Sequence, residues 1–551
     1  MKNFYLKPKL FSVMKNYSKE QFMKDLIAGI IVAIIALPLS IALALASGVE
    51  PACGVYTAIA AGFCVSLLGG SRVQIAGPTA AFATIVAGIV AANGMDGLFI
   101  ATVLAGIFLI LMGVFKFGSL IKFIPYTITT GFTAGIAVTI LVGQIKDFLG
   151  LQYAEGVKPV ETIEKLIANF EALSTFRWQA LAVGVVCLAI LIFYPKVEKR
   201  IPPSLIAVVV GALMVKLIPG MEEGVFTIGD LYTIPTGLPK VSLAGMDFSF
   251  AKIAAVLPDA FTIAILAGIE SLLSCVVADS MINSKHNSNA ELVGQGVANI
   301  ASVLFGGIPA TGAIARTAAN VKNGGRTPIA GMIHALVLLL VLLFLMPYAA
   351  LIPMPAIAAI LFVVAYNMSE WREFVHTVKT APKSDTFVMV LTFALTVIFD
   401  LVVAIAVGMV LAALLFMKRM SDETQVTGWK YGEGAEDPES IEMRVVPQDV
   451  RVYEITGPLF FGAADKIAEV TLKEYTRCLI LRMRGVSALD ATALNSLEKL
   501  YKKCEEKEVR LVLSHVNEQP LKAMKKAGFY DAVGAENFCA HIDEALEWAS
   551  K

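Results

Sequence analysis

Long apolar runs recur from residue 25 to residue 418, and they limit the possible folds more than any other feature of the sequence. Each run is about 20 residues long, and a helix of that length crosses roughly 30 Å of hydrocarbon. Only 16% of the 551 residues are charged, whereas a soluble domain is about one quarter charged. The sequence therefore predicts a multi-pass α-helical membrane protein surrounded by lipid.

Loop charges predict the topology. We identify fourteen hydrophobic segments, at residues 25–46, 51–68, 77–92, 97–116, 123–144, 178–195, 203–219, 257–279, 291–306, 311–321, 327–346, 350–367, 385–399 and 401–417. The loops after even-numbered segments carry Arg72, Lys116, Lys122, Lys196, Lys199, Arg200, Lys285, Lys322, Arg326, Arg372, Lys379 and Lys383. Three short loops after odd-numbered segments carry Glu50, Asp96 and Asp400 and no basic residue. Because cytoplasmic loops are rich in Lys and Arg, we expect fourteen spans with both termini in the cytoplasm.

An internal repeat is expected, because two look-alike hexamers precede segments 3 and 10, which are both too short to span the membrane. Residues 65–70 read VSLLGG and residues 302–307 read SVLFGG. Short segments interrupted by Gly and Pro at matching places are typical of inverted-repeat transporters. Two successive blocks of seven segments must have opposite orientations, so we expect a 7+7 inverted repeat with halves at about 25–220 and 257–418.

The short segments 3 and 10 predict an anion site. Irregular backbone within a membrane is tolerated where it lines a cavity or is buried in protein. Two half-helices that meet there offer unpaired N–H groups and the positive ends of two helix dipoles. The candidate donors are the N–H groups of Thr79, Ala80, Ala81, Ala313, Ile314 and Ala315. The alternative is that these small residues only allow tight helix packing.

Three polar side chains in apolar segments are further candidates. Arg316 lies one turn into segment 10. It is either a fixed positive charge behind the anion or a residue whose side chain extends to the membrane interface. Glu270 lies in the middle of segment 8, where burial favours the neutral carboxyl group, so it is a candidate proton carrier or a partner of Arg316. Ser274 follows Glu270 by one turn on the same helix face and completes a possible ion-coupling site.

The C-terminal part of the chain has the composition of a soluble domain. Residues 421–440 are polar and acidic, which predicts a linker, and strand-like runs then alternate with helix-like stretches. We expect a cytoplasmic segment 1–24, a membrane domain 25–420 and an α/β domain 441–551. Residues 1–420 carry a net charge of +6 and residues 421–551 one of −6, and nothing in this balance indicates nucleic-acid binding.

These residues resemble the sulfate permease (SulP) family, which is related to solute carrier family 26. The similar stretches are Asp25-Leu26-Ile27-Ala28-Gly29, Gly268-Ile269-Glu270-Ser271-Leu272-Leu273-Ser274, His286 to Asn299 and Gly312-Ala313-Ile314-Ala315-Arg316-Thr317. The C-terminal domain resembles a STAS domain. Relatives of that domain are phosphorylated at a Ser after an Asp, where this chain has Ala491, so regulation by a cytoplasmic protein partner stays open.

The resemblance implies a core domain and a gate domain, an elevator-like movement and a homodimer in a bacterial cytoplasmic membrane. It implies a small anion held between the third and tenth helices, by Thr79, Ala80, Ala81 and Phe82 on one side and by Ala313, Ile314, Ala315 and Arg316 on the other. Substrates in the family include sulfate, bicarbonate, chloride and dicarboxylates. Sodium-coupled bicarbonate members have Asp at the place of Glu270 and lack the arginine, so this chain is more similar to proton-coupled members.

Several functions remain open on the sequence. The first is proton-coupled anion symport, and the alternatives are sodium-coupled bicarbonate symport and an anion exchanger or channel on the same scaffold. A nucleobase permease has a similar architecture but normally lacks a STAS domain. No Ser/His/Asp, metal-ligand or P-loop arrangement is visible, so we expect no enzyme activity and no cofactor other than a proton or sodium as coupling ion.

Overall fold

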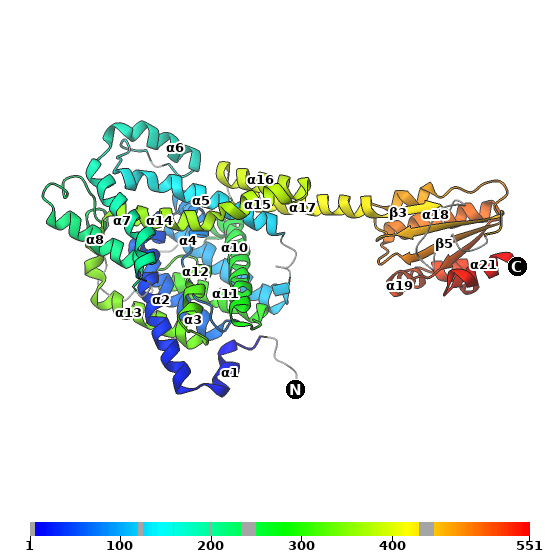
Figure 1. Ribbon diagram of the computed structural model, residues 1–551, viewed down its shortest axis with the longest axis horizontal. Coiled ribbons are helices and arrows are strands. Elements are labelled where there is room, and N and C mark those ends of the chain that lie inside the picture. Colours follow the sequence, from blue (N-terminus) through cyan, green and yellow to red (C-terminus); the bar gives the residue numbers. More distant parts are fainter. Residues whose placement is uncertain are drawn as a thin grey trace. The chain divides into compact units, whose positions relative to one another are not determined.

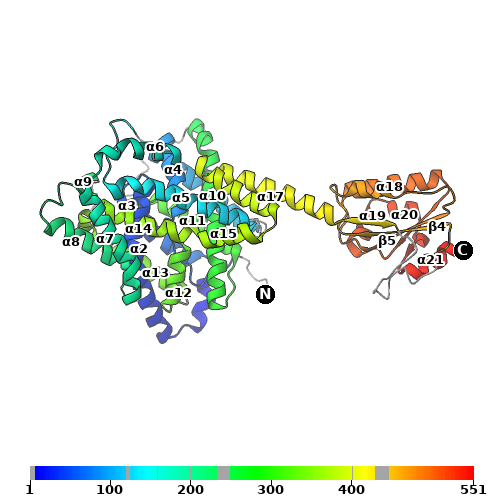
Figure 2. The ribbon, with the colours of Figure 1, turned by 45° about the horizontal axis from the view of Figure 1, so that its top comes forward.

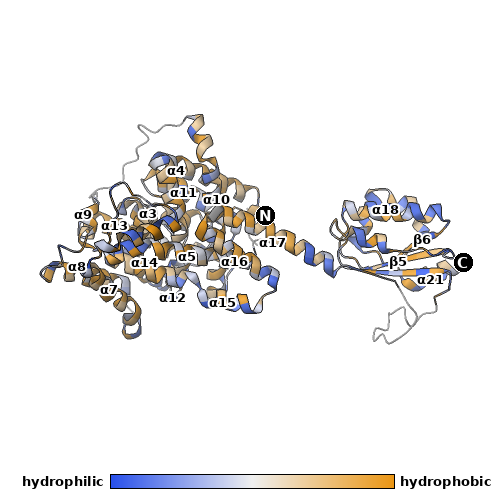
Figure 3. Cartoon of the chain, turned by 90° about the horizontal axis from the view of Figure 1, so that it is seen from above, coloured by the Kyte–Doolittle hydropathy of each residue, from blue (hydrophilic) through white to orange (hydrophobic). Residues whose placement is uncertain are grey.

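The computed structural model describes residues 6–119, 125–157, 159–198, 201–232, 249–399, 401–428 and 446–551. The chain divides into two compact units, one up to Met409 and one from Val410 onward (Figure 1). Figure 3 shows that hydrophobic residues dominate the helices of the first unit, whereas the second unit mixes hydrophobic and hydrophilic residues. The loop residues Lys122, Lys199, Arg200 and Asp400, which enter the topology prediction, lie outside the described residues.

The first unit is helical. Its helices are α1 Lys9–Val13, α2 Lys19–Ala46, α3 Pro51–Leu68, α4 Ala83–Val114, α5 Tyr126–Leu149, α6 Thr162–Glu171, α7 Trp178–Val197, α8 Pro203–Leu217, α9 Ile228–Leu231, α10 Phe250–Ile282, α11 Ser288–Leu304, α12 Ile314–Lys322, α13 Pro328–Phe344, α14 Met354–Ser369, α15 Trp371–Thr380 and α16 Lys383–Ile398, with 3-10 turns η1 Met14–Asn16, η2 Ala80–Phe82, η4 Ala172–Thr175 and η5 Met346–Leu351. Helix α17, Leu401–Glu423, contains the boundary between the units.

Every predicted hydrophobic segment coincides with a helix. Segments 3 and 4 are joined in α4, which bends at Gly94, where φ is 70°. Among the described residues, eight helices are long and apolar enough to cross a membrane, and α8 and α13 are shorter apolar helices. The α-helical membrane fold is thus confirmed, whereas the count of fourteen crossings stays a prediction.

The helices of the first unit pack mainly within two sets. Helices α2, α3, α4, α10, α11, α12 and α13 form one set, and α5, α7, α8, α14 and α16 form the other. Figure 2 shows α7 and α8 on one side of the unit and α10 and α11 on the other. Glycines allow close approach in the first set, because a Cβ on Gly106 of α4 would lie 2.7 Å from the Gly296 carbonyl oxygen of α11. The two sets correspond to the expected core and gate.

A two-stranded ribbon joins the repeat halves. Strand β1, Ala76–Gly77, pairs antiparallel with β2, Thr311–Gly312, so that Ala76 faces Gly312 and Gly77 faces Thr311. Each strand leads directly into a half-helix, β1 into η2 and α4, and β2 into α12. Segment 10 is a short helix as predicted, whereas segment 3 is the part of α4 before the bend at Gly94. The ribbon brings the N-termini of both together.

The second unit is an α/β domain. Its sheet has the order β3-β4-β5-β6-β7, with β3 antiparallel to β4 and the remaining pairs parallel. Its elements are β3 Gln425–Gly428, β4 Val450–Thr456, η7 Ala464–Glu469, β5 Cys478–Gly485, α18 Ala491–Glu506, β6 Arg510–Ser514, α19 Glu518–Lys526, α20 Phe529–Val533, η8 Ala535–Asn537, β7 Phe538–Cys539 and α21 Ile542–Ser550. Leu479 and Leu481 pack on one face of the sheet and Ile480 on the other, as expected for parallel strands covered on both faces.

The predicted linker needs correction at its start. Residues 421–423 are the last turn of α17, and residues 425–428 form the edge strand β3. Polar composition alone did not reveal this strand, because an edge strand with mostly exposed side chains needs no apolar face. The rest of the predicted linker, from residue 429 to residue 440, lies outside the described residues.

Candidate functional site

Two half-helix N-termini meet at the ribbon. Thr79 is the N-cap residue of η2, which continues into α4, and Ala313 is the N-cap residue of α12. The first N–H groups of a helix have no acceptor within it, and they carry the positive end of the helix dipole. Two such ends directed at one region favour a bound anion there.

The six predicted N–H donors are not equivalent. The N–H group of Ala313 donates to the Ile75 carbonyl at 2.8 Å, so it is already used by the ribbon and is not available to an anion. On this half-helix Ile314 and Ala315 remain, and both are exposed. On the other half-helix Thr79 is partly exposed, whereas Ala80 and Ala81 are buried. The pairing of Ala313 could not be seen in the sequence, because β1 and β2 lie far apart in the chain.

Phe82 is fully buried at the end of η2. Its side chain therefore packs inside the first unit in this conformation, and its predicted contact with substrate stays a prediction.

Arg316 is the largest fully buried side chain of the described residues, at 1% exposure. Its Nη2 donates to the Pro78 carbonyl at 3.3 Å, and its Nη1 lies against Gly77, where a Cβ would collide with it. Its Nε and Nη1 have no hydrogen-bond partner among the described residues. The guanidinium of one half-helix thus reaches the turn before the other, with unused donors and a positive charge directly behind the ribbon.

Glu270 binds both half-helix turns through threonine. The hydroxyl of Thr79 donates to Oε2 of Glu270 at 2.9 Å, and the hydroxyl of Thr311 donates to the same oxygen at 3.0 Å. No ion pair within 4.0 Å joins Glu270 to Arg316 in the described chain, so the predicted pairing of these residues is wrong in this conformation. Thr311 was missed by sequence reasoning, although a Thr in both turns was a visible signal.

Ser274 belongs to a different network. Its hydroxyl donates to Oε1 of Gln74 at 2.9 Å and lies 3.5 Å from the Thr317 hydroxyl. Gln74 in turn donates to the Ser271 carbonyl at 3.1 Å, and the Ser271 hydroxyl accepts from the Gly312 N–H at 3.0 Å. Ser274 therefore belongs to the hydrogen bonds that hold the ribbon against α10. It is not hydrogen-bonded to Glu270, although the helix spacing suggested that it would be.

A buried histidine was also missed. His334 on α13 is fully buried, and neither ring nitrogen has a hydrogen-bond partner among the described residues. Its Nδ1 would lie 3.4 Å from a Cβ on Gly62 of α3. One helical turn away on α3, the Ala58 Cα would lie 3.5 Å from a Cβ on Gly77, the residue that Nη1 of Arg316 also approaches. Unused polar atoms of Arg316 and His334 therefore share the region behind β1. Buried groups of this kind are usually satisfied by water or an ion. In the sequence, a single His in an otherwise apolar run was the signal that could have identified His334.

Metal binding has little support from side chains. No group of three or more His, Cys, Asp or Glu residues that could hold a metal ion occurs among the residues that the structure describes. The site combines helix N-termini and a buried cation, which attract an anion, with a single carboxylate, which can take up a proton.

Comparisons with known proteins point in the same direction. Residues 22–392 match the Sulfate permease family and residues 440–545 match the STAS domain. The chain is 42% identical to "Putative sulfate transporter YvdB" of Bacillus subtilis (strain 168), over 96% of this chain and 98% of that protein. It is 31% identical to "Bicarbonate transporter BicA" of Picosynechococcus sp. (strain ATCC 27264 / PCC 7002 / PR-6), over 95% and 94% of the two chains.

A solved structure supports the fold. The murine Solute Carrier 26 family member A9 anion transporter, in an inward-facing state, superposes with a TM-score of 0.88 over 99% of this chain and 94% of that chain. The two chains are 19% identical, so this likeness concerns the fold alone.

Proposed function

From the premise that this chain belongs to the sulfate permease family and is an anion transporter, we propose that it carries a small oxyanion by proton-coupled symport. The substrate classes that we consider are sulfate, bicarbonate and dicarboxylates. The observation that carries the proposal is the bridging of both half-helix turns by the carboxylate of Glu270, through Thr79 and Thr311. We propose further that the protein is a homodimer in a bacterial cytoplasmic membrane, with both termini in the cytoplasm, and that a cytoplasmic protein binds its STAS domain.

The anion would bind at the N-terminal ends of η2 and α12. The N–H groups of Thr79, Ile314 and Ala315 would donate to it, and the charge of Arg316 behind the ribbon would attract it. The carboxylate of Glu270 touches both turns, so its negative charge would repel an incoming anion. A proton taken up by Glu270 removes this repulsion, and reciprocity requires that a bound anion favours the protonated Glu270 by the same factor.

The movement that we propose is of the elevator type. The helices pack mainly within two sets, and both half-helices, Glu270 and Arg316 belong to the same set. A movement of this set against the other would carry the whole site as one body, because the ribbon and the Gln74 network connect its parts. A passive channel would not need a buried titratable carboxylate at the site.

Sodium-coupled bicarbonate symport is the second candidate. It is favoured by the 31% identity to a bicarbonate transporter. The separation of Ser274 from the Glu270 network speaks against the pair of side chains that we expected to bind sodium. One experiment tests both candidates, namely uptake of labelled sulfate, bicarbonate and fumarate into proteoliposomes under an imposed proton gradient or an imposed sodium gradient. Uptake that needs sodium and ignores the proton gradient would reject proton symport.

A further inference from the structure

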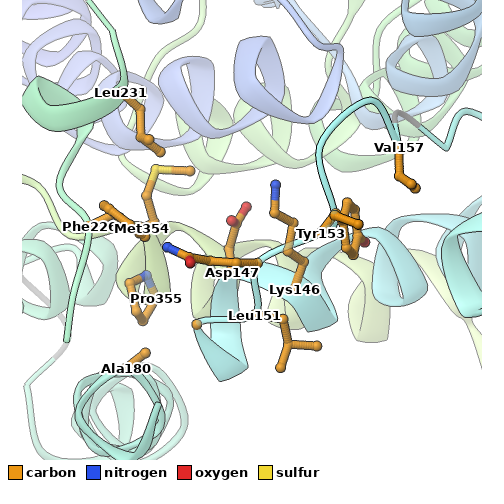
Figure 4. A pocket seen from close by; sticks show the side chains of 13 residues that line it. Lys146, Asp147, Leu151, Tyr153, Val157, Ala180, Phe226, Leu231, Met354 and Pro355 are labelled. Atoms are coloured by element: carbon orange, nitrogen blue, oxygen red, sulfur yellow. The ribbon is translucent and has the colours of Figure 1, made fainter. Parts of the chain in front are cut away.

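A cavity of about 440 Å³ lies at the C-terminal end of α5 (Figure 4). Its walls come from the last turn of α5 and the loop after it, the start of α7, the region around α9 and the first turn of α14. None of these elements contributes to the half-helix site. Because α5 is the fifth segment of the predicted topology, we expect its C-terminal end to face the exterior. The cavity is therefore separate from the anion site and would be reached from outside the cell.

Two opposite charges line this cavity, near enough to attract each other but without a close ion pair between them. Figure 4 shows the Lys146 ammonium and the Asp147 carboxylate extending in the same direction from the last turn of α5. Neither group makes a hydrogen bond, or an ion pair within 4.0 Å, with a side chain of the described residues. The ammonium lies only over the Tyr153 ring, at 4.7 Å from its centroid. Partly buried charges without partners are costly unless a ligand supplies the missing groups.

Two helix ends also line the cavity, one with a negative and one with a positive dipole end. The C-terminal end of α5, closed by Gly150, and the N-terminal end of α14 contribute only their dipoles, because the Lys146 carbonyl accepts from Leu151 N–H and the Met354 N–H donates to the Phe226 carbonyl, both at 2.8 Å. A simple anion would leave Asp147 unpaired and be repelled by it, and a simple cation would meet the same difficulty at Lys146. A ligand with both charges can satisfy both side chains at once.

The remaining lining sets the size and polarity of the ligand. Leu151, Phe226, Met354 and Pro355 give the cavity apolar and aromatic walls. Its volume lies within the range of small-molecule sites, about 300–1,000 Å³. We propose that this cavity binds a small zwitterion with an apolar side chain, of the class of free α-amino acids, with its ammonium at Asp147 and its carboxylate at Lys146.

The test is ligand binding by the full-length protein in lipid nanodiscs, measured as a shift of the melting temperature and by calorimetry. The probes are leucine, valine, methionine and phenylalanine, together with two leucine analogues that carry one charge each. Isoamylamine lacks the carboxylate and 4-methylpentanoate lacks the ammonium. We expect saturable binding of at least one amino acid, and binding of its single-charge analogue at least about tenfold weaker, because each analogue loses one charged contact.

Two variants locate the site. Asp147→Asn and Lys146→Met should each weaken amino-acid binding by about tenfold or more. Asp96→Asn is the matched control, because Asp96 lies just after the bend of α4, away from the cavity, with its carboxylate 3.6 Å from the Lys252 ammonium. This variant should bind the amino acid as the wild type does. Arg316→Ala should also bind the amino acid normally, which separates this site from the anion site.

The proposal is overturned if none of the four amino acids binds, or if Asp147→Asn and Lys146→Met bind as tightly as the wild type. Equal binding of isoamylamine would make the cavity a cation site, and equal binding of 4-methylpentanoate would make it an anion site; both results contradict a zwitterion site. Asp147→Asn removes an unpaired carboxylate, so its melting temperature without ligand should not fall. If the Asp147→Asn protein does not fold, the Lys146→Met protein still tests the site independently.

Discussion

Thr79 and Thr311 donate hydrogen bonds to the same carboxylate oxygen of Glu270, at 2.9 and 3.0 Å. Thr79 lies before one half-helix and Thr311 before the other, and Glu270 comes from a third helix, α10. The two turns that would hold the anion are thus connected through one titratable group.

Glu270→Gln should separate binding from coupling. The amide oxygen can still accept from both threonine hydroxyls, so the site should keep its shape and exchange anion across the membrane. Accumulation against a gradient should be lost, because the amide takes up no proton, and the pH dependence of binding between about 5 and 8 should disappear. Counterflow and gradient-driven uptake in the same proteoliposomes measure the two activities. A Glu270→Gln protein that still accumulates anion would contradict proton coupling through this residue.

Arg316→Ala should weaken anion binding by about tenfold or more, because it removes the positive charge behind the ribbon and the hydrogen bond to the Pro78 carbonyl. Arg316→Lys should recover part of the loss, since it keeps the charge but not the planar guanidinium. The measurement is KM for each transported anion, with the melting temperature as a folding check. Unchanged affinity of Arg316→Ala for every anion would show that the charge has no part in binding.

Thr79→Val and Thr311→Val should each weaken transport several-fold, because each removes one hydrogen bond worth about 1 kcal/mol. The two changes should be non-additive, since both hydroxyls bind one oxygen. A double-mutant cycle on KM and on the proton dependence of uptake measures this coupling. Ser274→Ala is the matched control, because its hydroxyl bonds Gln74 and not Glu270. Strictly additive effects would mean that the two turns act independently.

Deletion of residues 424–551 should leave the anion site intact. It removes the whole sheet including β3, whereas a cut at residue 440 would leave β3 without its partner β4. All residues of the candidate site lie in the first unit, so KM should stay at the wild-type value while the amount of protein in the membrane, dimer stability or maximal rate falls. A truncated protein that is folded in the membrane but no longer binds anion would contradict this division.

Tyr17 should make stability fall at alkaline pH. Its hydroxyl donates to Oδ2 of the buried Asp25 at 3.0 Å, and burial, together with the charge of Asp25, raises the pKa of Tyr17 to about 12 from 10.0. The folded state therefore holds the proton more tightly than the unfolded state. The contribution of Tyr17 is complete below pH 10 and is lost as the pH rises toward about 12.

Tyr17→Phe tests this dependence. Below pH 10 the wild type should be more stable than Tyr17→Phe, by about 1 kcal/mol or less for one partly exposed hydrogen bond. The difference in melting temperature should shrink between pH 10 and 12. A difference that stays constant over this range would mean that the Tyr17 proton is not bound more tightly in the folded protein.

The sequence by itself determined the helices, the two matching half-helices, the α/β domain and the nature of Glu270 and Arg316 as polar residues within apolar segments. These features are local: a run of apolar residues predicts a membrane helix, and the Gly- and Pro-containing stretches before segments 3 and 10 mark the two interruptions. The soluble sheet also followed from local runs, apart from the polar edge strand β3.

Only the tertiary structure decided which polar groups meet. Helix spacing placed Ser274 beside Glu270, but packing directs Ser274 to Gln74, 200 residues away, and Glu270 to Thr79, 191 residues away. The ribbon takes up the Ala313 N–H, and Arg316 reaches the turn of the opposite half-helix. Residues on one helix face share a direction, but the partner on that side is set by how distant helices pack. Hydrogen bonds between those helices therefore could not be read from spacing along the chain.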